Sequence, residues 1–199
     1  MKFNKWFLFL IPVIAILAYF SIPTAKPVDE TGANVLKIRR DKDSALQDDE
    51  ESPIKDKATF KGLKYYSFNK DYIVDFVLEK AEKAKTVELK MTDGTTEKLI
   101  LFGKIKGEIG GFTVSLVLYQ HEDGNFFLPF KDKTAPTETY GGGRFLDLPL
   151  TNVKNNRLRV DFNLAYNPYC AYNEDFACPI PPAENTLPIR IEAGEKRFN

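Results

Sequence analysis

The feature that most constrains the fold is an alternation of apolar and polar residues with a period of two, which begins after Thr59. This period is typical of β-strands with one buried face. The alternating stretches are 72–79, 87–91, 98–105, 112–119, 126–130, 157–164 and a short closing stretch, 189–191. Asp93-Gly94, Gly110-Gly111 and Asp123-Gly124 supply tight turns between them. Residues 58–199 are therefore predicted to form an all-β domain, either an antiparallel sandwich or a partly closed barrel.

The first 22 residues have the pattern of an export signal. Lys2 and Lys5 precede an uncharged apolar run, 6–22. A cleavage site after Ala25 would put Pro23 at position −3, where a small residue is needed. We therefore favour a retained transmembrane signal anchor over a removed signal peptide. Because the two lysines favour an N-terminus on the inside, the domain is expected to be membrane-anchored and extracytoplasmic, either periplasmic or extracellular.

Residues 23–57 are predicted to be a charged tether between anchor and domain. They contain the acidic run 48–51, followed by Ser52-Pro53. The spacing of Val35, Ile38, Ala45 and Leu46 permits one short amphipathic helix. The basic residues of this helix can contact anionic lipid headgroups or lie in solvent, and we favour solvent.

The composition excludes two classes of function. The chain has 28 basic and 28 acidic residues, so it has no excess of positive charge for binding nucleic acid. Its single histidine, His121, and its two cysteines, Cys170 and Cys178, rule out a multi-histidine metal centre. We expect no nucleic-acid partner, no metal and no cofactor.

Long sequence words gather in the C-terminal part of the chain. They read PFKDKTAPTETYGGGRFLD, DFNLAYNPYCAYNEDFACPIPPAEN and AGEK, within residues 129–196. These words closely resemble those of an uncharacterised bacterial family, domain of unknown function 1684. With FKGL at 60–63, the resemblance covers roughly residues 35–199. Two residues depart from the family pattern, since Pro136 replaces a glycine and Phe145 a tyrosine. The family has no established activity, so the resemblance implies no function.

Three consecutive glycines, Gly141, Gly142 and Gly143, precede Arg144 and form the first candidate site. Glycines allow positive φ and close backbone approach, so amide N–H groups can point at an anion. The planar guanidinium can bind a carboxylate or phosphate through two hydrogen bonds. An equally weighted alternative is a structural bend in which Arg144 pairs with an acidic residue. As a site residue, Arg144 is expected to line a partly open pocket with a carboxylate and with Tyr140 or Tyr166.

Several carboxylates lie in the same group of loops. Two of them can act as acid and base in glycosidic hydrolysis, although pairing with Arg144 or with backbone N–H groups is favoured. Asp161 and Asn163 share one strand face, opposite Val160 and Phe162, and point into either a polar pocket or solvent. The candidates are Asp132, Glu138, Asp147, Asp161 and Glu184.

Cys170 and Cys178 are separated by seven residues, which is no recognised zinc spacing. In an exported domain we favour a disulfide between them. Two free structural thiols are the next interpretation. A metal site and a nucleophile come last, because His121 lies in a solvated hairpin.

Three classes of function remain. The favoured one is a binding module for a small anionic or sugar-like ligand, because sugars need aromatic faces and fixed hydrogen bonds. An envelope hydrolase with a carboxylate pair or an Arg-assisted site is the second, and a structural or interaction domain is the third. The candidate ligand-binding residues are Asp132, Tyr140, Gly141, Gly142, Gly143, Arg144, Asp147, Asp161, Asn163, Tyr166 and Glu184, and Tyr169 and Tyr172 supply further rings.

Overall fold

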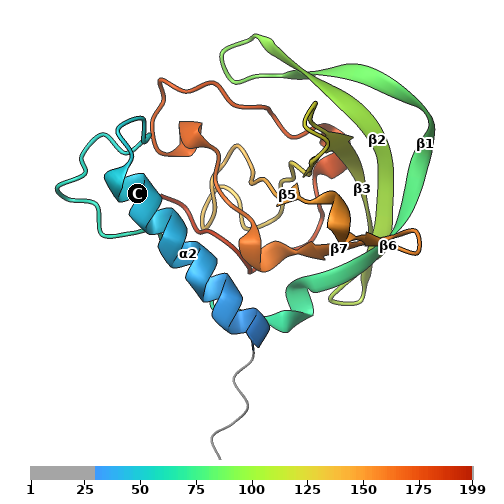
Figure 1. Ribbon diagram of the computed structural model, residues 1–199, viewed down its shortest axis with the longest axis horizontal. Coiled ribbons are helices and arrows are strands. Elements are labelled where there is room, and N and C mark those ends of the chain that lie inside the picture. Colours follow the sequence, from blue (N-terminus) through green and yellow to red (C-terminus); the bar gives the residue numbers. More distant parts are fainter. Residues whose placement is uncertain (1–29, 199) are drawn as a thin grey trace, which may run out of the picture.

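A computed structural model describes residues 30–198 of the chain (Figure 1). The expected signal anchor, residues 1–22, lies outside the described residues. Within 30–198, no helix is long and apolar enough to cross a membrane. The elements are α2 (Glu30–Asp48), η1 (Lys70–Tyr72), β1 (Ile73–Lys90), β2 (Thr96–Ile109), β3 (Phe112–Gln120), β4 (Phe126–Phe127), β5 (Asp147–Leu148), η2 (Leu150–Asn152), β6 (Val153–Lys154), β7 (Arg157–Asp161), η3 (Phe162–Leu164), η4 (Tyr169–Ala171) and η5 (Ala183–Asn185).

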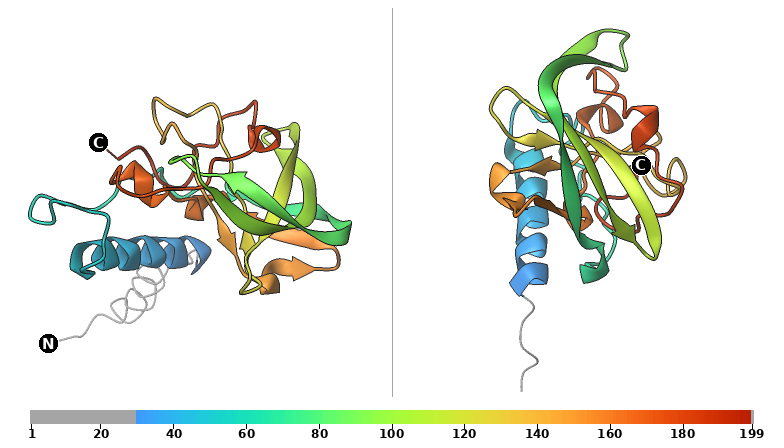
Figure 2. Two further views of the ribbon diagram at one scale, coloured as in Figure 1. Left: turned by 90° about the horizontal axis from the view of Figure 1, so that it is seen from above. Right: turned by 90° about the vertical axis from the view of Figure 1, so that its right-hand side faces the viewer.

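The seven strands form one antiparallel sheet in the order β5-β4-β3-β2-β1-β7-β6. The sheet curves along one side of the molecule, and α2 lies on the other side (Figures 1 and 2). Because β5 and β6 are free edges, the sheet is open. The structure thus confirms the antiparallel β class. In place of the expected sandwich or partly closed barrel, the described residues form an open sheet covered by irregular segments.

Strand β1 is longer than the sequence predicts. Two strands were expected, at 72–79 and 87–91, but the chain forms one strand of 18 residues that pairs with β2. The pairing register shifts between Lys80 and Lys85. The residues of this stretch, 80–85, are mostly charged and mostly exposed. A strand with both faces in solvent needs no alternation of apolar and polar residues, so the sequence of this stretch does not predict a strand.

The expected hairpin turns are confirmed. Gly110 and Gly111 join β2 to β3, and both have positive φ, 57° and 81°. Such angles are favoured in two-residue hairpin loops because they match the strand twist. At Asp93-Gly94, the Met91 N–H donates to the Thr95 carbonyl at 2.9 Å. The turns therefore set the register of β1, β2 and β3.

The main core lies between the sheet and the irregular segments. Phe76 and Leu78 of β1 are fully buried and cluster with Phe162. Ile189 and Ile191, expected to form a closing strand, are buried in the same cluster but belong to no strand. Their backbone bonds run to the segment around Asp132, where the Lys133 N–H donates to the Ile189 carbonyl at 2.9 Å. Irregular segments thus cover the buried face of the sheet, as a second sheet does in a sandwich.

Helix α2 packs against the rest of the protein, unlike the tether expected for residues 23–57. Val35, Arg39 and Leu46 are buried, and their spacing places them on one face of the helix. The Arg39 guanidinium donates to the carbonyls of Tyr66 at 2.8 Å and Asn163 at 2.9 Å. From Glu30 onward the chain is therefore part of the folded body, and Arg39 faces the protein core instead of solvent or lipid.

Candidate functional site

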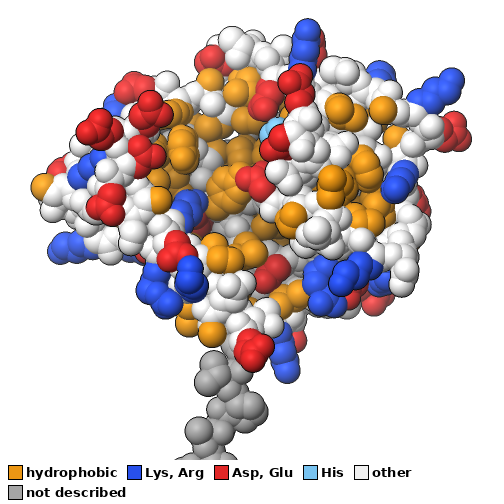
Figure 3. All heavy atoms as spheres, in the orientation of Figure 1, with side chains coloured by type: hydrophobic (Ala, Val, Ile, Leu, Met, Phe, Trp, Pro, Cys, Tyr) orange, Lys and Arg blue, Asp and Glu red, His pale blue; other side chains and the backbone are white. Residues whose placement is uncertain are grey.

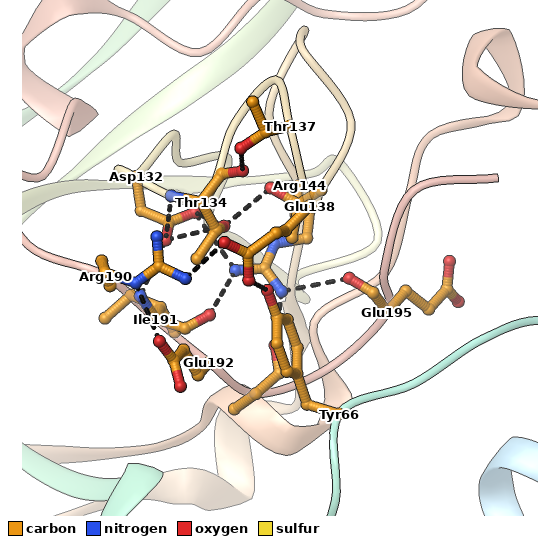
Figure 4. A network of polar contacts seen from close by, with 12 residues as sticks. Tyr66, Asp132, Thr134, Thr137, Glu138, Arg144, Arg190, Ile191, Glu192 and Glu195 are labelled. Atoms are coloured by element: carbon orange, nitrogen blue, oxygen red, sulfur yellow. Dashed lines mark hydrogen bonds and ion pairs between the residues drawn. The ribbon is translucent and has the colours of Figure 1, made fainter. Parts of the chain in front are cut away.

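Arg144 lies in the core, with a side chain that is 1% exposed. One terminal nitrogen donates to Asp132 Oδ1 at 3.2 Å and to the Ile191 carbonyl at 2.8 Å. The other donates to the carbonyls of Ala193 and Glu195 (Figure 4). Burial lowers the pKa of the guanidinium from its ordinary value, and the Asp132 carboxylate opposes this shift. The prediction that Arg144 lines a partly open pocket is therefore wrong, because the side chain is buried and protein acceptors already occupy both terminal nitrogens.

Asp132 completes this buried network. Its carboxylate accepts hydrogen bonds from the Thr134 hydroxyl at 2.9 Å and from the Ile191 N–H at 2.7 Å. It is 5% exposed, so it is as inaccessible to a ligand as its arginine partner. Asp132 and Arg144 together clamp the C-terminal segment, 191–195, onto the rest of the protein. They therefore have a structural role.

One of the three glycines, Gly143, serves this clamp. Only Gly143 has a positive φ, 99°, and a Cβ there would meet the Phe130 carbonyl oxygen at 2.6 Å. That close approach allows Phe130 and Arg144 to exchange two backbone hydrogen bonds of 2.9 Å. The Gly143 N–H donates to the Tyr140 carbonyl and so is not free for an anion. Gly141 and Tyr140 line a separate cavity, with a volume of about 460 Å³, beside Cys170.

The other predicted residues are dispersed. Asp161 precedes η3 and accepts hydrogen bonds from the backbone and side-chain nitrogens of Asn163, at 2.9 and 2.8 Å. Glu184 is exposed in η5. Among the five candidate carboxylates, only Asp147 lines the large pocket described next. The carboxylate pair expected for a hydrolase is therefore not assembled there from the predicted residues.

A pocket with a volume of about 540 Å³ lies between α2, the segment 145–147 that leads into β5, and the loops that follow β7. We call it the helix–sheet pocket. Figure 3 shows a hollow between α2 and the sheet, with apolar side chains on its floor. Its apolar lining consists of Ile38, Tyr65, Phe145, Leu164, Ala165, Tyr166, Pro168, Tyr169, Phe176, Ala177 and Cys178. Its polar lining consists of Arg39, Lys42, Asp147, Asn163 and Glu195.

A buried carboxylate, Glu195, organises one part of the pocket wall. The side chain is 1% exposed and accepts a short hydrogen bond from the Lys42 ammonium. Its second oxygen accepts from the Tyr172 hydroxyl and from the Asn167 N–H. Burial raises the pKa of Tyr172 well above its ordinary range, and the negative charge of Glu195 adds to this shift. Tyr172 therefore stays a hydrogen-bond donor at physiological pH.

Tyr166 connects Lys42 with the second polar group, Asp147. The Lys42 ammonium lies 4.7 Å from the centroid of the Tyr166 ring, and the Tyr166 hydroxyl donates to Asp147 Oδ2 at 2.6 Å. The other oxygen of Asp147 lies 3.9 Å from Nε2 of His121. Burial raises the pKa of Tyr166 far above its ordinary value. An aromatic face is thus flanked by an ammonium and a half-exposed carboxylate.

Cys170 and Cys178 are free, buried thiols in the structure, whereas the sequence favours a disulfide between them. They are neighbours all the same, since the Cys170 N–H donates to Cys178 Sγ at 3.2 Å. A hydrogen bond from Cys178 lowers the pKa of Cys170 to about 7, although burial opposes this. The loop between them is held without a covalent bond, because the Cys178 N–H donates to Thr92 Oγ1 at 3.1 Å.

The sequence prediction missed Lys42 and Glu195, which carry the charges of this wall. The sequence pattern places Lys42 in the tether and Glu195 only within the word AGEK. Two signals were present. Val35, Arg39, Lys42 and Leu46 share one face of a helix, which indicates a packed helix with polar partners. The second is the glycine before Glu195, since a glycine can mark a close backbone approach. The structure shows this approach, because Gly194 has a φ of +77° and a Cβ added there would meet the Ala165 carbonyl oxygen at 2.5 Å.

The comparisons with known proteins agree with the sequence words. Residues 58–196 match a family described as "Protein of unknown function (DUF1684)". The solution NMR structure of an uncharacterised protein from Haloarcula marismortui is similar, with a TM-score of 0.67 and 30% sequence identity. The alignment covers 84% of this chain and 95% of that chain. No curated protein matches the chain.

Proposed function

The chain belongs to the family of unknown function DUF1684, and we propose that its domain is a binding module that holds a small sugar-like ligand in the helix–sheet pocket. The observation that carries the proposal is the composition of this pocket. Ligand sites are typically concave and mostly apolar, with a few placed polar groups, and volumes of 300–1,000 Å³ are usual. The helix–sheet pocket has this character and a volume of about 540 Å³.

A ligand with a flat apolar face and hydroxyl groups fits the polar atoms of the pocket. The rings of Tyr166 and Tyr169 line it, and rings of this kind pack against the apolar face of a sugar. Asp147 is half exposed, and Tyr166 occupies only one of its oxygens, so the other can accept from a ligand hydroxyl. An ammonium has three donors, of which Glu195 and Tyr172 take two of those on Lys42, leaving one for the ligand.

The anionic alternative has less support in this pocket. Arg39 donates to two backbone carbonyls, and Lys42 is paired with Glu195. The open donor of Lys42 thus belongs to an ammonium whose charge Glu195 already balances. A neutral ligand with hydroxyl groups can use this donor and the open oxygen of Asp147, whereas the Asp147 carboxylate repels an anion.

The first prediction is that filling the pocket abolishes binding. Ala177 is exposed and lines the pocket, so Ala177→Trp places a large ring there without disturbing the core. We expect the full chain to bind phenyl β-glucoside saturably in a calorimetric titration, and Ala177→Trp to bind it about tenfold more weakly or worse. Ala183→Trp is the matched control, since Ala183 is exposed in η5 outside this lining. Equal binding by the two variants, or no saturable binding by the wild type, contradicts the proposal.

We also propose that the module acts on the outer side of the cytoplasmic membrane, held there by residues 1–22 as a retained anchor. The proposal rests on the lysines and the apolar run of the sequence. We expect protein extracted from its native membrane to have the intact mass of the full chain. A mature N-terminus near Lys26 in that fraction, or a soluble form beginning there, contradicts the anchor.

A further inference from the structure

A second pocket is formed where the chain after α2 meets the C-terminal residues. Its volume is about 520 Å³, and it is lined by residues of 54–64, by Tyr172 and by 196–198. These two segments lie at the same end of the molecule in Figure 1 and in the left view of Figure 2. We call it the basic pocket, because its charged lining consists of Lys55, Lys61, Lys64, Lys196, Arg197 and a single carboxylate, Asp56.

Five cations against one carboxylate is an unusual balance for a chain whose formal net charge is zero. Two of the cations have partners, since Lys55 pairs with Asp175 at 2.8 Å and the Lys196 ammonium lies 4.6 Å from the centroid of the Tyr66 ring. Within residues 30–198, the side chains of the other three have no hydrogen bond or ion pair. These three are Lys61, Lys64 and Arg197.

Hydrogen bonds fix the backbone of the two segments that carry these cations. The Lys196 N–H donates to the Lys64 carbonyl at 2.8 Å, which fixes the C-terminal residues beside the loop. The Leu63 N–H donates to Asp43 Oδ1 of α2 at 3.1 Å, which fixes the loop to the helix. Like charges that are held close together repel one another, and a bound anion relieves this repulsion. The arrangement therefore favours a negatively charged ligand.

Aromatic rings lie in the same pocket as the cations. The Phe198 ring lies 5.3 Å from the Tyr172 ring and 6.5 Å from the Phe60 ring, measured between centroids. All three residues line the pocket. Ring faces attract an apolar or aromatic body, and the basic side chains attract a phosphate or carboxylate. A ligand that has both parts satisfies the pocket better than a free inorganic anion.

We propose that the basic pocket is a second binding site, which takes a small organic anion: a phosphate or carboxylate attached to an apolar ring. The site shares none of its lining residues with the helix–sheet pocket. Failure of an anion to bind the basic pocket is therefore distinguishable from failure of a sugar-like ligand to bind the helix–sheet pocket. The anion-binding role first assigned to Arg144 is thus reassigned to side chains that are exposed and unpaired.

The test is a titration of the full chain with phenyl phosphate at low ionic strength, followed by calorimetry. Inorganic phosphate and phenol, as the separate halves of this probe, are the comparison ligands. We expect saturable binding of phenyl phosphate that is tighter than that of either half. Replacing Lys61 and Lys64 together by glutamine is expected to weaken it about tenfold or more, because two charge-assisted hydrogen bonds are lost. Phe198→Ala is expected to weaken phenyl phosphate more than inorganic phosphate.

The matched control removes two charges elsewhere. Lys83 and Lys85 are exposed on β1 and outside the basic pocket, so replacing both by glutamine changes the net charge equally. We expect this variant to bind phenyl phosphate as the wild type does. An equal loss in the two double variants means non-specific charge attraction and overturns the site. Absence of saturable binding by the wild type also overturns it.

Discussion

Arg144→Lys is expected to lower the free energy of unfolding by about 3 kcal/mol, because it breaks a buried network around a charge that stays in the core. The guanidinium reaches acceptors on two segments, Asp132 and the carbonyls of 191–195. An ammonium donates from a single point and cannot reach all of them at once. For a chain of this size the melting temperature should fall by roughly 6–12 °C, which thermal unfolding measures directly.

Arg159→Lys is the matched control for this loss. Arg159 also makes a two-pronged ion pair, with Asp75 at 2.9 and 2.8 Å, but the two side chains are 64% and 42% exposed. An exposed pair contributes about 1 kcal/mol or less. We also expect folded Arg144→Lys to bind phenyl β-glucoside with unchanged affinity, because Arg144 does not line the pocket. Equal melting temperatures for Arg144→Lys and the wild type, or a selective loss of ligand, contradict the structural role.

The strands could be predicted from the sequence because a sheet with one buried face requires apolar residues at every second position of its strands. Phe76 and Leu78 alternate with exposed residues, and both are buried as the period of two requires. This pattern does not predict how a segment is paired when it is buried without regular secondary structure. Ile189 and Ile191 are as apolar as strand residues, but their backbone bonds go to an irregular segment, including the Asp132 carboxylate.

The site was predicted in part. Asp147, Asn163 and Tyr166 line the helix–sheet pocket, as candidates should, whereas Arg144 and Asp132 lie in the core. No local pattern distinguishes an arginine that meets a ligand from one that meets backbone carbonyls. The carbonyls that surround Arg144 come from residues about 50 positions later in the chain, at separations of 47, 49 and 51. Such long-range partners are fixed by tertiary packing and not by local sequence.

Glu195→Gln is expected to destabilise the protein by about 2–4 kcal/mol, with its main effect on the attachment of α2. A buried carboxylate that loses its charge leaves its donors poorly matched, and removal of one partner from a buried ion pair is costly. The donors here are Lys42 on α2, Tyr172 and the Asn167 N–H. We place the loss somewhat below that of a fully buried pair because the Lys42 side chain is 27% exposed and can turn to water.

Hydrogen exchange of the α2 amides separates this role from a general loss of stability. Glu192→Gln is the control, because Glu192 is three residues earlier and 51% exposed in an ion pair with Arg190. We expect α2 amides to exchange faster in Glu195→Gln than in Glu192→Gln, since the link between helix and C-terminal segment is cut only in the first. In a double-mutant cycle with Lys42→Met, the two losses should add to more than the loss of the double variant. Strictly additive losses would mean that Lys42 and Glu195 act independently. They would contradict the proposal that this ion pair attaches α2 to the C-terminal segment.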